Sequence, residues 1–433
     1  MLYVGIDWAQ AEHAVCLLDE QGQVLASRSI PDTSAGFTLL QALCATYTTD
    51  PGQVIVGIET DHGLLVRALV AAGYRLYAIN PKAASRYRER HSVSGAKSDR
   101  ADARLLADVV RTDRARHRLL AHDSAQVTAL VHLTRMHKRL IWDQQRYANQ
   151  LRDTLRDYYP AALDAVGRDL TSPVALAVLR RAPTPERGRK LSRRQLVGLL
   201  RRAGAERRLE ERAQTLWEAL HATQQEQPAV VADALGTATG SLVALLTSCA
   251  KQIATLEATL TEQFKAHPDA ELIRSLPGLG AILGARVLAE FGDDPTGYAD
   301  SRARKCAAGT APITRASGKR QTVGRRRATN TWLLDGCMRW AFVSLQQSPG
   351  ARAYYDELRA RGKGHYPALR ALANRWVGIL HGCLRARRPY DEATAWPDVT
   401  LVAETTKLQT TPEKPSKKPG SDRSSIPTIP HSA

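Results

Sequence analysis

The feature that most constrains this chain is a pair of short apolar runs that each end in an acid. Asp7 ends the run at 2–7 (LYVGID), and Glu59 ends a near copy of it at 54–59 (VIVGIE). Runs rich in Val and Ile of this length are typical of buried strands. A carboxylate that interrupts such a run costs desolvation free energy unless a cation or a hydrogen-bond donor compensates it. The two acids are therefore candidates for a shared cation site.

A second pair of acids, Asp99 and Asp102, has helical spacing. Residues i and i+3 lie on one face of a helix, so both carboxylates can reach one site. Taken alone, the pair reads better as an exposed acidic turn that is neutralised by neighbouring arginines. Together with Asp7 and Glu59, it predicts four carboxylates round one point. Such oxygen ligands suit Mg²⁺, and two-metal sites of this kind cut phosphodiester bonds.

The charge balance of the chain points to a polyanionic partner. Its 433 residues include 61 Lys and Arg against 43 Asp and Glu, a formal net charge of +18. Nucleic acid is the simplest partner for that excess. No 18-residue apolar span is evident, so we expect no membrane helix. The six scattered cysteines contain no CxxC pair, which favours reduced thiols in a cytoplasmic protein over a disulfide framework or a zinc site.

Residues 1–120 read as one α/β domain. Three short strands come first, and helices then alternate with two further strands. The expected strands are 2–9, 13–19, 24–30, 54–59 and 75–79, and the expected helices are 35–46, 64–72, one after Pro81 and one through Asp99 and Asp102. Three antiparallel strands followed by alternating β and α are the order of a ribonuclease-H-like fold.

Residues 121–270 read as a helical, coiled-coil region. Apolar residues recur at alternating threes and fours in two stretches, 130–151 and 242–260. Each stripe needs a partner, and pairing within the chain or across a two-fold axis would supply one. We expect a dimer through the 242–260 helix. Between the two stretches, residues 180–212 hold twelve Lys or Arg against four acids, which favours RNA binding and a solvated helical face about equally.

Residues 271–390 read as a mainly helical C-terminal domain, and 391–433 as a disordered tail rich in Pro, Ser, Thr and Lys. The segment 273–284 resembles a helix-hairpin-helix. In that motif Gly278 and Gly280 would let backbone N–H groups approach a DNA phosphate closely. An ordinary tight turn between two helices is the alternative.

A serine beside a glycine stands among cations near the middle of this C-terminal domain. The serine is Ser317, and the cations are Arg315, Lys319, Arg320, Arg325, Arg326 and Arg327. Guanidinium groups round a serine fit a nucleophile whose attack on phosphorus they stabilise. On these residues alone, a basic loop in which Ser317 only contacts a phosphate is the simpler interpretation.

These motifs, taken in order, resemble the IS110 family of insertion-sequence transposases, the bridge-RNA-guided DEDD/serine recombinases. The resemblance covers residues 1–384. The segments that carry it are 5–7, 58–60, 80–81, 97–103, 276–280, 307–312 and 316–319.

The resemblance implies an N-terminal domain like the Holliday-junction resolvase RuvC, in which Asp7, Glu59, Asp99 and Asp102 bind Mg²⁺. It implies that Ser317 attacks DNA and forms a covalent phosphoserine link. It also implies that acids and serine come from different protomers, in dimers that meet as a tetramer on donor and target DNA. A non-coding bridge RNA would choose both DNAs by base pairing, in the bacterial cytoplasm at the nucleoid.

Other functions stay open at this point. A site-specific invertase would use the same residues on a fixed DNA segment. A RuvC-like junction endonuclease would use the four acids alone and would not need Ser317. A non-catalytic basic nucleic-acid-binding protein is the rival of another class, but it has no use for four acids, which repel phosphate when no metal is bound.

Overall fold

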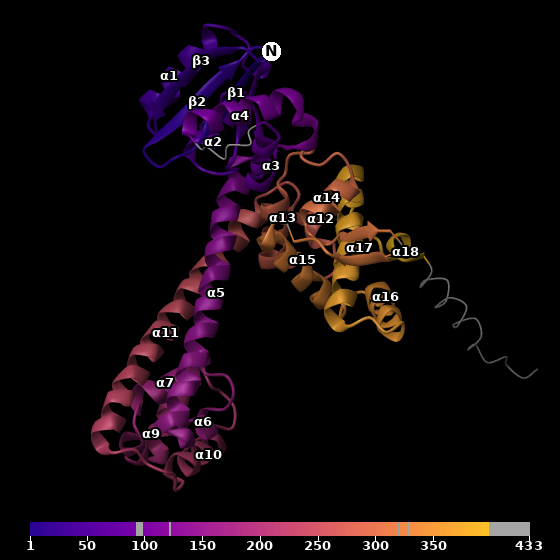
Figure 1. Ribbon diagram of the computed structural model, residues 1–433. Helices are drawn as coiled ribbons and strands as arrows, with labels where there is room; N and C mark the ends of the chain where they lie inside the picture. The colour runs from indigo at the N-terminus through magenta and orange to yellow at the C-terminus, as the bar shows by residue number, and fades with distance from the viewer. Residues whose placement is uncertain (92–97, 121–122, 319, 328, 398–433) are drawn as a thin grey trace, which may run out of the picture.

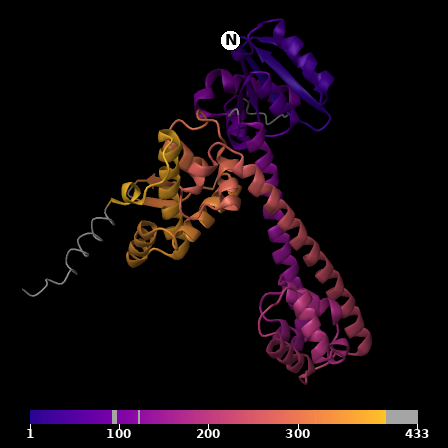
Figure 2. The same ribbon diagram turned by 180° about the vertical axis from the view of Figure 1, so that it is seen from behind.

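The computed structural model describes residues 1–91, 98–120, 123–318, 320–327 and 329–397. Lys319 and most of the expected tail lie outside these residues. A long two-helix rod organises the chain (Figure 1). The N-terminal α/β domain stands at one end of the rod and a small helical domain at the other. The C-terminal domain packs beside the rod, near the end that adjoins the N-terminal domain, as the reverse view also shows (Figure 2).

The N-terminal domain is built on a six-stranded sheet in the order β3-β2-β1-β4-β5-β6. Strand β1 pairs in parallel with β4, and β4 with β5, whereas the other neighbours are antiparallel. The strands are β1 (Leu2–Asp7), β2 (Glu12–Leu18), β3 (Val24–Pro31), β4 (Val54–Ile58), β5 (Arg75–Ala78) and β6 (Arg118–Leu119). The expected series of strands is confirmed, and β6 is an addition that two residues are too short to signal.

Helices cover both faces of this sheet. They are α1 (Ser34–Ala45), α2 (Leu64–Ala71), α3 (Pro81–His91) and α4 (Asp99–Thr112), with single 3₁₀ turns η1 (Pro51–Gln53) and η2 (Arg114–Arg116). Leu2, Val4 and Ile6 share a core with α1 and α2. Tyr3 lies on the opposite face in a core with α4, as the two-residue alternation of a strand requires.

The rod consists of α5 (Ala125–Tyr158) and α11 (Ala229–Lys265), which lie side by side (Figures 1 and 2). Leu242 and Leu246 of α11 are buried in one core with Leu151 and Leu155 of α5. Leu260 is buried with residues of α5 in the core of the C-terminal domain. The expected dimer contact through the 242–260 stripe is therefore wrong for these leucines, because their own chain covers them.

A small helical domain joins the far ends of α5 and α11. Its helices are α6 (Pro160–Val166), α7 (Pro173–Arg181), α8 (Pro185–Arg189), α9 (Arg193–Arg202) and α10 (Leu209–His221). Leu179, Leu196 and Leu220 are buried in its core. The Arg-rich stretch is thus a folded unit, and it keeps four arginines of α9 exposed: Arg193, Arg194, Arg201 and Arg202.

The C-terminal domain is mainly helical, as expected, with one two-stranded hairpin. Its elements are α12 (Ala270–Arg274), α13 (Ala281–Phe291), α14 (Ser301–Ala307), β7 (Pro312–Ser317), β8 (Arg320–Arg325), α15 (Thr331–Ser344), α16 (Pro349–Ala360), α17 (His365–Ala386) and α18 (Glu392–Ala395). Trp376 stacks on Trp340 and meets Trp396 edge-on in its core. Trp396 is 2% exposed, so the expected boundary at residue 390 was placed too early.

Helix α11 corrects the expectation that the chain holds no long apolar span. It contains an 18-residue window of mean hydropathy 1.7, and by length and composition it is the one helix among the described residues that could cross a membrane. In this structure 28% of that window is buried. Core helices of folded proteins share this length and composition, so these two properties do not identify a membrane span.

Two neighbouring leucines of α11 can show whether its apolar stripe stabilises the folded chain or a dimer. Leu246 is fully buried, whereas Leu245 is 44% exposed. We expect Leu246→Lys to lower the free energy of unfolding by roughly 3 kcal/mol or more, because the ammonium group loses its hydration. The matched control Leu245→Lys should change it by less than about 0.5 kcal/mol. Urea denaturation with light scattering measures both effects. A stable, monomeric Leu246→Lys protein from a dimeric wild type would contradict the intrachain packing.

Candidate active site

The ends of β1 and β4 place two of the four acids side by side. The two strands are parallel, and Ile6 is the register partner of Ile58. The next residues along each strand are Asp7 and Glu59. Neighbouring strands lie about 4.8 Å apart, so both carboxylates leave the sheet at the same edge. Asp7 is half-buried and Glu59 is exposed.

Paired glycines let helix α4 lie directly on these two strands. Gly5 and Gly57 are opposite each other in the register of β1 and β4. A Cβ on Gly5 would come within 1.8 Å of the carbonyl oxygen of Ala103, and one on Gly57 within 2.5 Å of that of Leu106. No larger residue fits at either position. This contact explains why the two apolar runs are near copies, with a glycine at the same place in each.

The close contact holds Asp102, the residue before Ala103, against the sheet. Asp102 is 5% exposed, and its Oδ1 accepts hydrogen bonds from Nε (3.0 Å) and Nη2 (2.5 Å) of Arg88 on α3. Asp99 is exposed in the first turn of α4, where the partial positive charge of a helix N-terminus favours a carboxylate. All four acids thus lie on elements that meet at one edge of the sheet.

The four acids are not gathered tightly enough to bind a metal ion in this arrangement. Within the described ranges, no group of three or more Asp, Glu, His or Cys side chains could hold an ion. The donor set fits Mg²⁺, because all four side chains offer hard oxygen ligands. However, Arg88 occupies the carboxylate of Asp102. A metal ion that binds Asp102 must therefore compete with this guanidinium group.

The competition between Arg88 and a metal ion can be measured. Arg88→Ala leaves the Asp102 carboxylate buried without a partner, so we expect the metal-free protein to unfold at a lower temperature, with a loss of about 1–3 kcal/mol. Mg²⁺ or Mn²⁺ should then stabilise this variant more than the wild type. Thermal melts with EDTA and with each ion measure both effects. The control is Arg90→Ala, an exposed arginine on the same helix. If the metal ions raised the unfolding temperature equally in all three proteins, Asp102 would not be a ligand of the metal.

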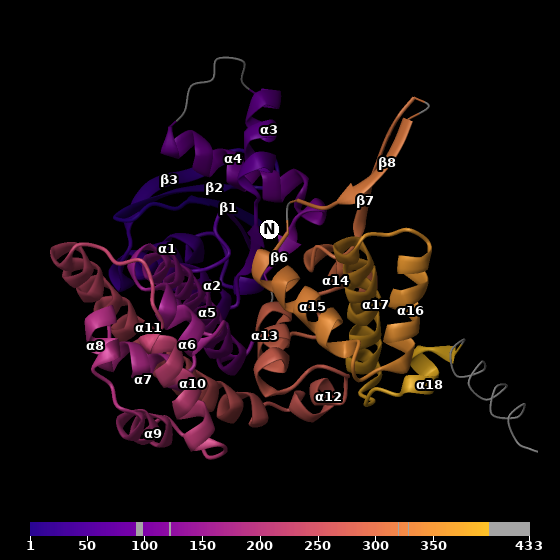
Figure 3. The same cartoon turned by 90° about the horizontal axis from the view of Figure 1, so that it is seen from below.

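Ser317 lies on a hairpin, not in the basic loop that was the simpler interpretation. Strands β7 and β8 are antiparallel, and Ser317 and Arg320 form the last pair before the turn. Gly318 has a φ of 55°, in the left-handed region that glycine adopts without strain. The hairpin projects beyond the helices of its domain (Figure 3). Ser317 is exposed, with Arg315, Arg320, Arg325 and Arg327.

Arg326 differs from the other arginines of this segment because it turns back into the domain. Its Nη2 lies 3.6 Å from Sγ of Cys306 on α14, and its Nε is buried without a hydrogen-bond partner in the structure. Arg326 therefore anchors the base of the hairpin. The exposed arginines are better placed than Arg326 to meet a phosphate.

The expected helix-hairpin-helix turn is used for packing. Gly278 is buried with a φ of 88°, and its N–H donates to Oε1 of Gln347 at 2.7 Å. Trp340 Nε1 donates to the carbonyl oxygen of Pro277 at 2.8 Å. Both bonds tie the turn to α15 and the residues just after it. Gly280 is exposed at the start of α13, so it is the glycine of the pair whose backbone stays open to a phosphate.

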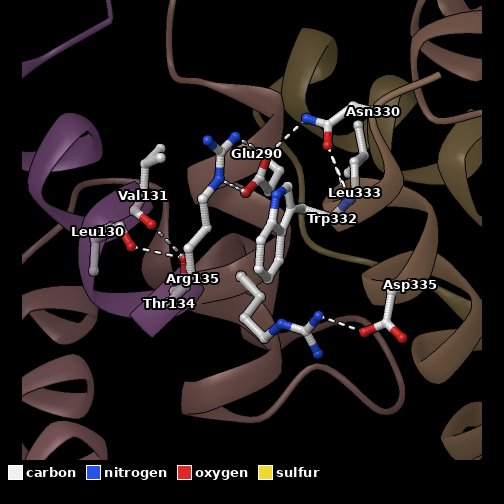
Figure 4. A network of polar contacts seen from close by, with 10 residues as sticks. Leu130, Val131, Thr134, Arg135, Glu290, Asn330, Trp332, Leu333 and Asp335 are labelled. Carbon is white, nitrogen blue, oxygen red and sulfur yellow. Dashed lines mark hydrogen bonds and ion pairs between the residues drawn. The ribbon is translucent and has the colours of Figure 1, made fainter. Parts of the chain in front are cut away.

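A polar network ties the hairpin to the rod (Figure 4). Glu290 of α13 accepts two hydrogen bonds from Arg135 of α5 (2.7 and 2.9 Å) and one from Asn330 (2.6 Å). Asn330 follows the hairpin and caps α15, since its Oδ1 accepts the N–H groups of Trp332 and Leu333. The hydrogen bonds to Glu290 raise the pKa of Arg135 above its ordinary value. Arg135 was not singled out from the sequence, and this network was missed.

A second set of ion pairs lies next to this network. Asp335 of α15 accepts from Arg286 of α13 at 2.6 Å and lies 3.1 Å from Nζ of Lys138 on α5. Burial alone would raise the pKa of Asp335, but the bonds from Arg286 and Lys138 outweigh it and hold the pKa below its usual range. The C-terminal domain is thus fixed to α5 through paired charges as well as through its apolar core.

Known proteins similar to this chain decide its family. Residues 4–160 match a transposase family of the DEDD IS110 type, and residues 270–356 match the transposase family IS116/IS110/IS902. A mini-circle protein of IS117 from Streptomyces coelicolor is 43% identical over 406 residues, which are 93% of this chain and 98% of that protein. The chain belongs to the IS110 family of transposases. A 42 kDa protein of the insertion element IS900 from Mycobacterium paratuberculosis is 31% identical over 91% of this chain and 98% of its own length.

The family matches fall on the parts of this IS110 transposase that carry the expected site. The first match spans the N-terminal domain and α5, and the second includes the hairpin of Ser317. Most of the small helical domain lies between the two. The family assignment made from the motifs is confirmed, and with it the activity of a transposase. The roles of the individual acids and of Ser317 stay predictions.

Proposed function

We propose that this transposase cuts and exchanges DNA strands with Asp7, Glu59, Asp99 and Asp102 as a Mg²⁺ site and Ser317 as nucleophile. The observation that carries the proposal is the strand register that sets Asp7 beside Glu59, with Asp102 held over the same strands by α4. Bound there, Mg²⁺ would stabilise the charge that develops on the phosphate oxygens. The carboxylates can also take up a proton from an attacking hydroxyl.

The chemistry assigned to Ser317 is a phosphoryl transfer in two steps. Its Oγ forms a bond to phosphorus while the bond from phosphorus to one sugar oxygen breaks. The hydroxyl proton passes by way of a carboxylate to the leaving sugar oxygen. A sugar hydroxyl of the exchanged strand then attacks the phosphoserine, restores the serine hydroxyl and closes the new phosphodiester. The exposed Arg315 and Arg320 can balance the charge on the phosphate.

The position of the hairpin supports a site made from two protomers. It projects beyond its own domain (Figure 3), and Ser317 and its arginines are exposed. Such a hairpin can reach the acids of a second chain. Strand exchange also needs two active centres held together, so we propose a dimer that forms a tetramer on donor and target DNA. The dimer contact must lie outside the buried stripe of α11.

Guidance by a bridge RNA is the finer part of the proposal. The net charge of +18 suits a protein that holds RNA and DNA together. Exposed arginines cluster on α9 of the small helical domain, well away from the acids (Figure 1). We propose that the RNA contacts this domain and the N-terminal half of the chain, while the Ser317 hairpin takes DNA. Both partners place the protein at the nucleoid in the bacterial cytoplasm.

Mutation of the two halves of the site tests the mechanism. Asp102→Asn should abolish strand cleavage by weakening metal binding, and Ser317→Ala should leave DNA binding intact but form no protein–DNA adduct. The control Thr314→Ala changes an exposed hydroxyl on the same strand and should keep full activity. Denaturing gels of labelled DNA measure adduct and product. Mixing the Asp102→Asn and Ser317→Ala proteins should restore part of the activity if the site is shared between protomers.

The same experiment separates the rival functions. Normal cleavage by Ser317→Ala would replace the recombinase with a junction endonuclease that uses the acids alone. Full recombination by Asp102→Asn would remove the acids from the mechanism. The DNA that flanks the gene distinguishes an invertase. Inverted repeats round a fixed segment would identify an invertase, whereas the ends of an insertion element would identify a transposase.

The RNA contact is tested by charge removal on α9. Replacing Arg193, Arg194, Arg201 and Arg202 with Gln should weaken RNA binding and reduce its dependence on salt. The slope of log K against log salt concentration should become shallower by up to about 0.7 for each phosphate that is no longer neutralised. A control with Arg352 of α16 and Arg361, the residue just after α16, changed to Gln removes arginines that are already paired with acids. Filter binding at several salt concentrations measures the effect. Unchanged affinity in the α9 variant would mark this face as solvated.

A further inference from the structure

Two tryptophans from distant parts of the sequence stack where α15 meets the rod. Trp142 of α5 and Trp332 of α15 have ring centroids 5.2 Å apart and planes 29° apart. Trp142 remains 45% exposed, whereas Trp340, Trp376 and Trp396 are almost fully buried. Burying an exposed aromatic ring against a ligand would be favourable, because it removes apolar surface from water. The pair is therefore a candidate binding surface.

Three cations surround the two rings. The guanidinium carbons of Arg135 and Arg139 lie 5.8 and 5.6 Å from the ring centroid of Trp332, and Nζ of Lys138 lies 5.2 Å from that of Trp142. Glu290 neutralises Arg135, and Asp335 neutralises Lys138. Arg139 is exposed, and no carboxylate of the described residues pairs with it. One uncompensated positive charge thus stands beside an exposed aromatic stack.

We propose that Trp142, Trp332 and Arg139 form a stacking site for an unpaired base of DNA, with Arg139 on the adjacent phosphate. Proteins bind single-stranded nucleic acid by combining these two elements, an aromatic face for the base and a cation for the backbone. The proposal rests on the proposed function, because strand exchange is the step that leaves bases unpaired.

The position of the stack favours DNA over RNA. Arg67 of α2, the helix that follows the Glu59 loop, lies within 3.4 Å of His132 on α5, Nη1 to Nε2. Trp142 is ten residues further along α5, about 15 Å at the rise of an α-helix. The stack therefore lies on the part of α5 that is next to the domain of the four acids. The exposed arginines of α9, which we assign to RNA, lie at the far end of the rod (Figure 1).

The test is binding of the full-length protein to three labelled probes in EDTA, where no strand can be cut. The probes are a thymidine oligonucleotide of about 12 nucleotides, the uridine ribonucleotide of equal length and a DNA duplex of the same length. The proteins are the wild type, Trp142→Leu, Trp142→Phe, Arg139→Gln and the control Tyr366→Leu. Tyr366 is 70% exposed on α17. Fluorescence anisotropy gives each Kd, and urea midpoints check the fold.

We expect Trp142→Leu to weaken binding of the thymidine probe by about 5-fold to 100-fold, the range for loss of one stacked base. Duplex binding should change less than twofold, Trp142→Phe should restore most of the affinity, and Tyr366→Leu should have no effect. Arg139→Gln should lower the salt slope for the thymidine probe by about 0.7.

Three results would overturn the proposal. Unchanged affinity in Trp142→Leu would mean that the stack binds nothing. Equal losses on all three probes, without rescue by Trp142→Phe, would show that the stack only holds α15 on α5. A larger loss on the uridine probe would make it an RNA site. Since no cleavage enters these measurements, failure of the mechanism in the Asp102→Asn experiment would leave their outcome unaffected.

Discussion

The close packing of α4 on β1 and β4 is the contact on which the rest of the site depends. It exists because Gly5 and Gly57 face each other across the two strands and leave no side chain in the way. Any Cβ would push α4 off the sheet, and Asp102 would leave the strand ends with it. Two positions after each glycine stand Asp7 and Glu59, the acids proposed to carry the chemistry. The same two short segments, 2–7 and 54–59, thus supply both the close packing and two of the candidate catalytic acids.

The rod places the four acids and the Arg-rich domain far apart, although the two regions are close in the sequence. Helices α5 and α11 bury each other's apolar stripes, so the chain needs no second copy to satisfy them. One end of the rod carries the acids and the other carries the Arg-rich domain. The C-terminal domain is fixed beside the first end by the hydrogen bonds that Arg135 of α5 donates to Glu290 of α13. If the Arg-rich domain holds RNA as proposed, this arrangement keeps the RNA contact at a distance from the acids.

The sequence predicted what depends on local periodicity and missed what depends on contacts between distant residues. The strands of the N-terminal domain and the helix α5 follow from apolar patterns of period two and of three to four. Strands β7 and β8 were missed because nearly every residue in them is exposed, so no apolar alternation marks them. The fold of residues 160–221 was missed because helices of five to thirteen residues broken by Pro and Gly give weak patterns. The bond between Arg88 and Asp102 joins two helices and has no signature in the sequence.

Each half of the candidate site depends on a partner that its own chain does not supply in this structure. In a single chain without metal, Arg88 holds the Asp102 carboxylate, and Ser317 stands exposed on a projecting hairpin (Figure 3). Under the proposed mechanism neither half acts alone, because the acids need a cation and the serine needs a base. A metal ion and a second protomer with DNA would complete the halves together, since the DNA phosphate is a ligand for both. An enzyme that breaks chromosomes gains safety from such a requirement, because strand cleavage then waits until the partner strand is in place.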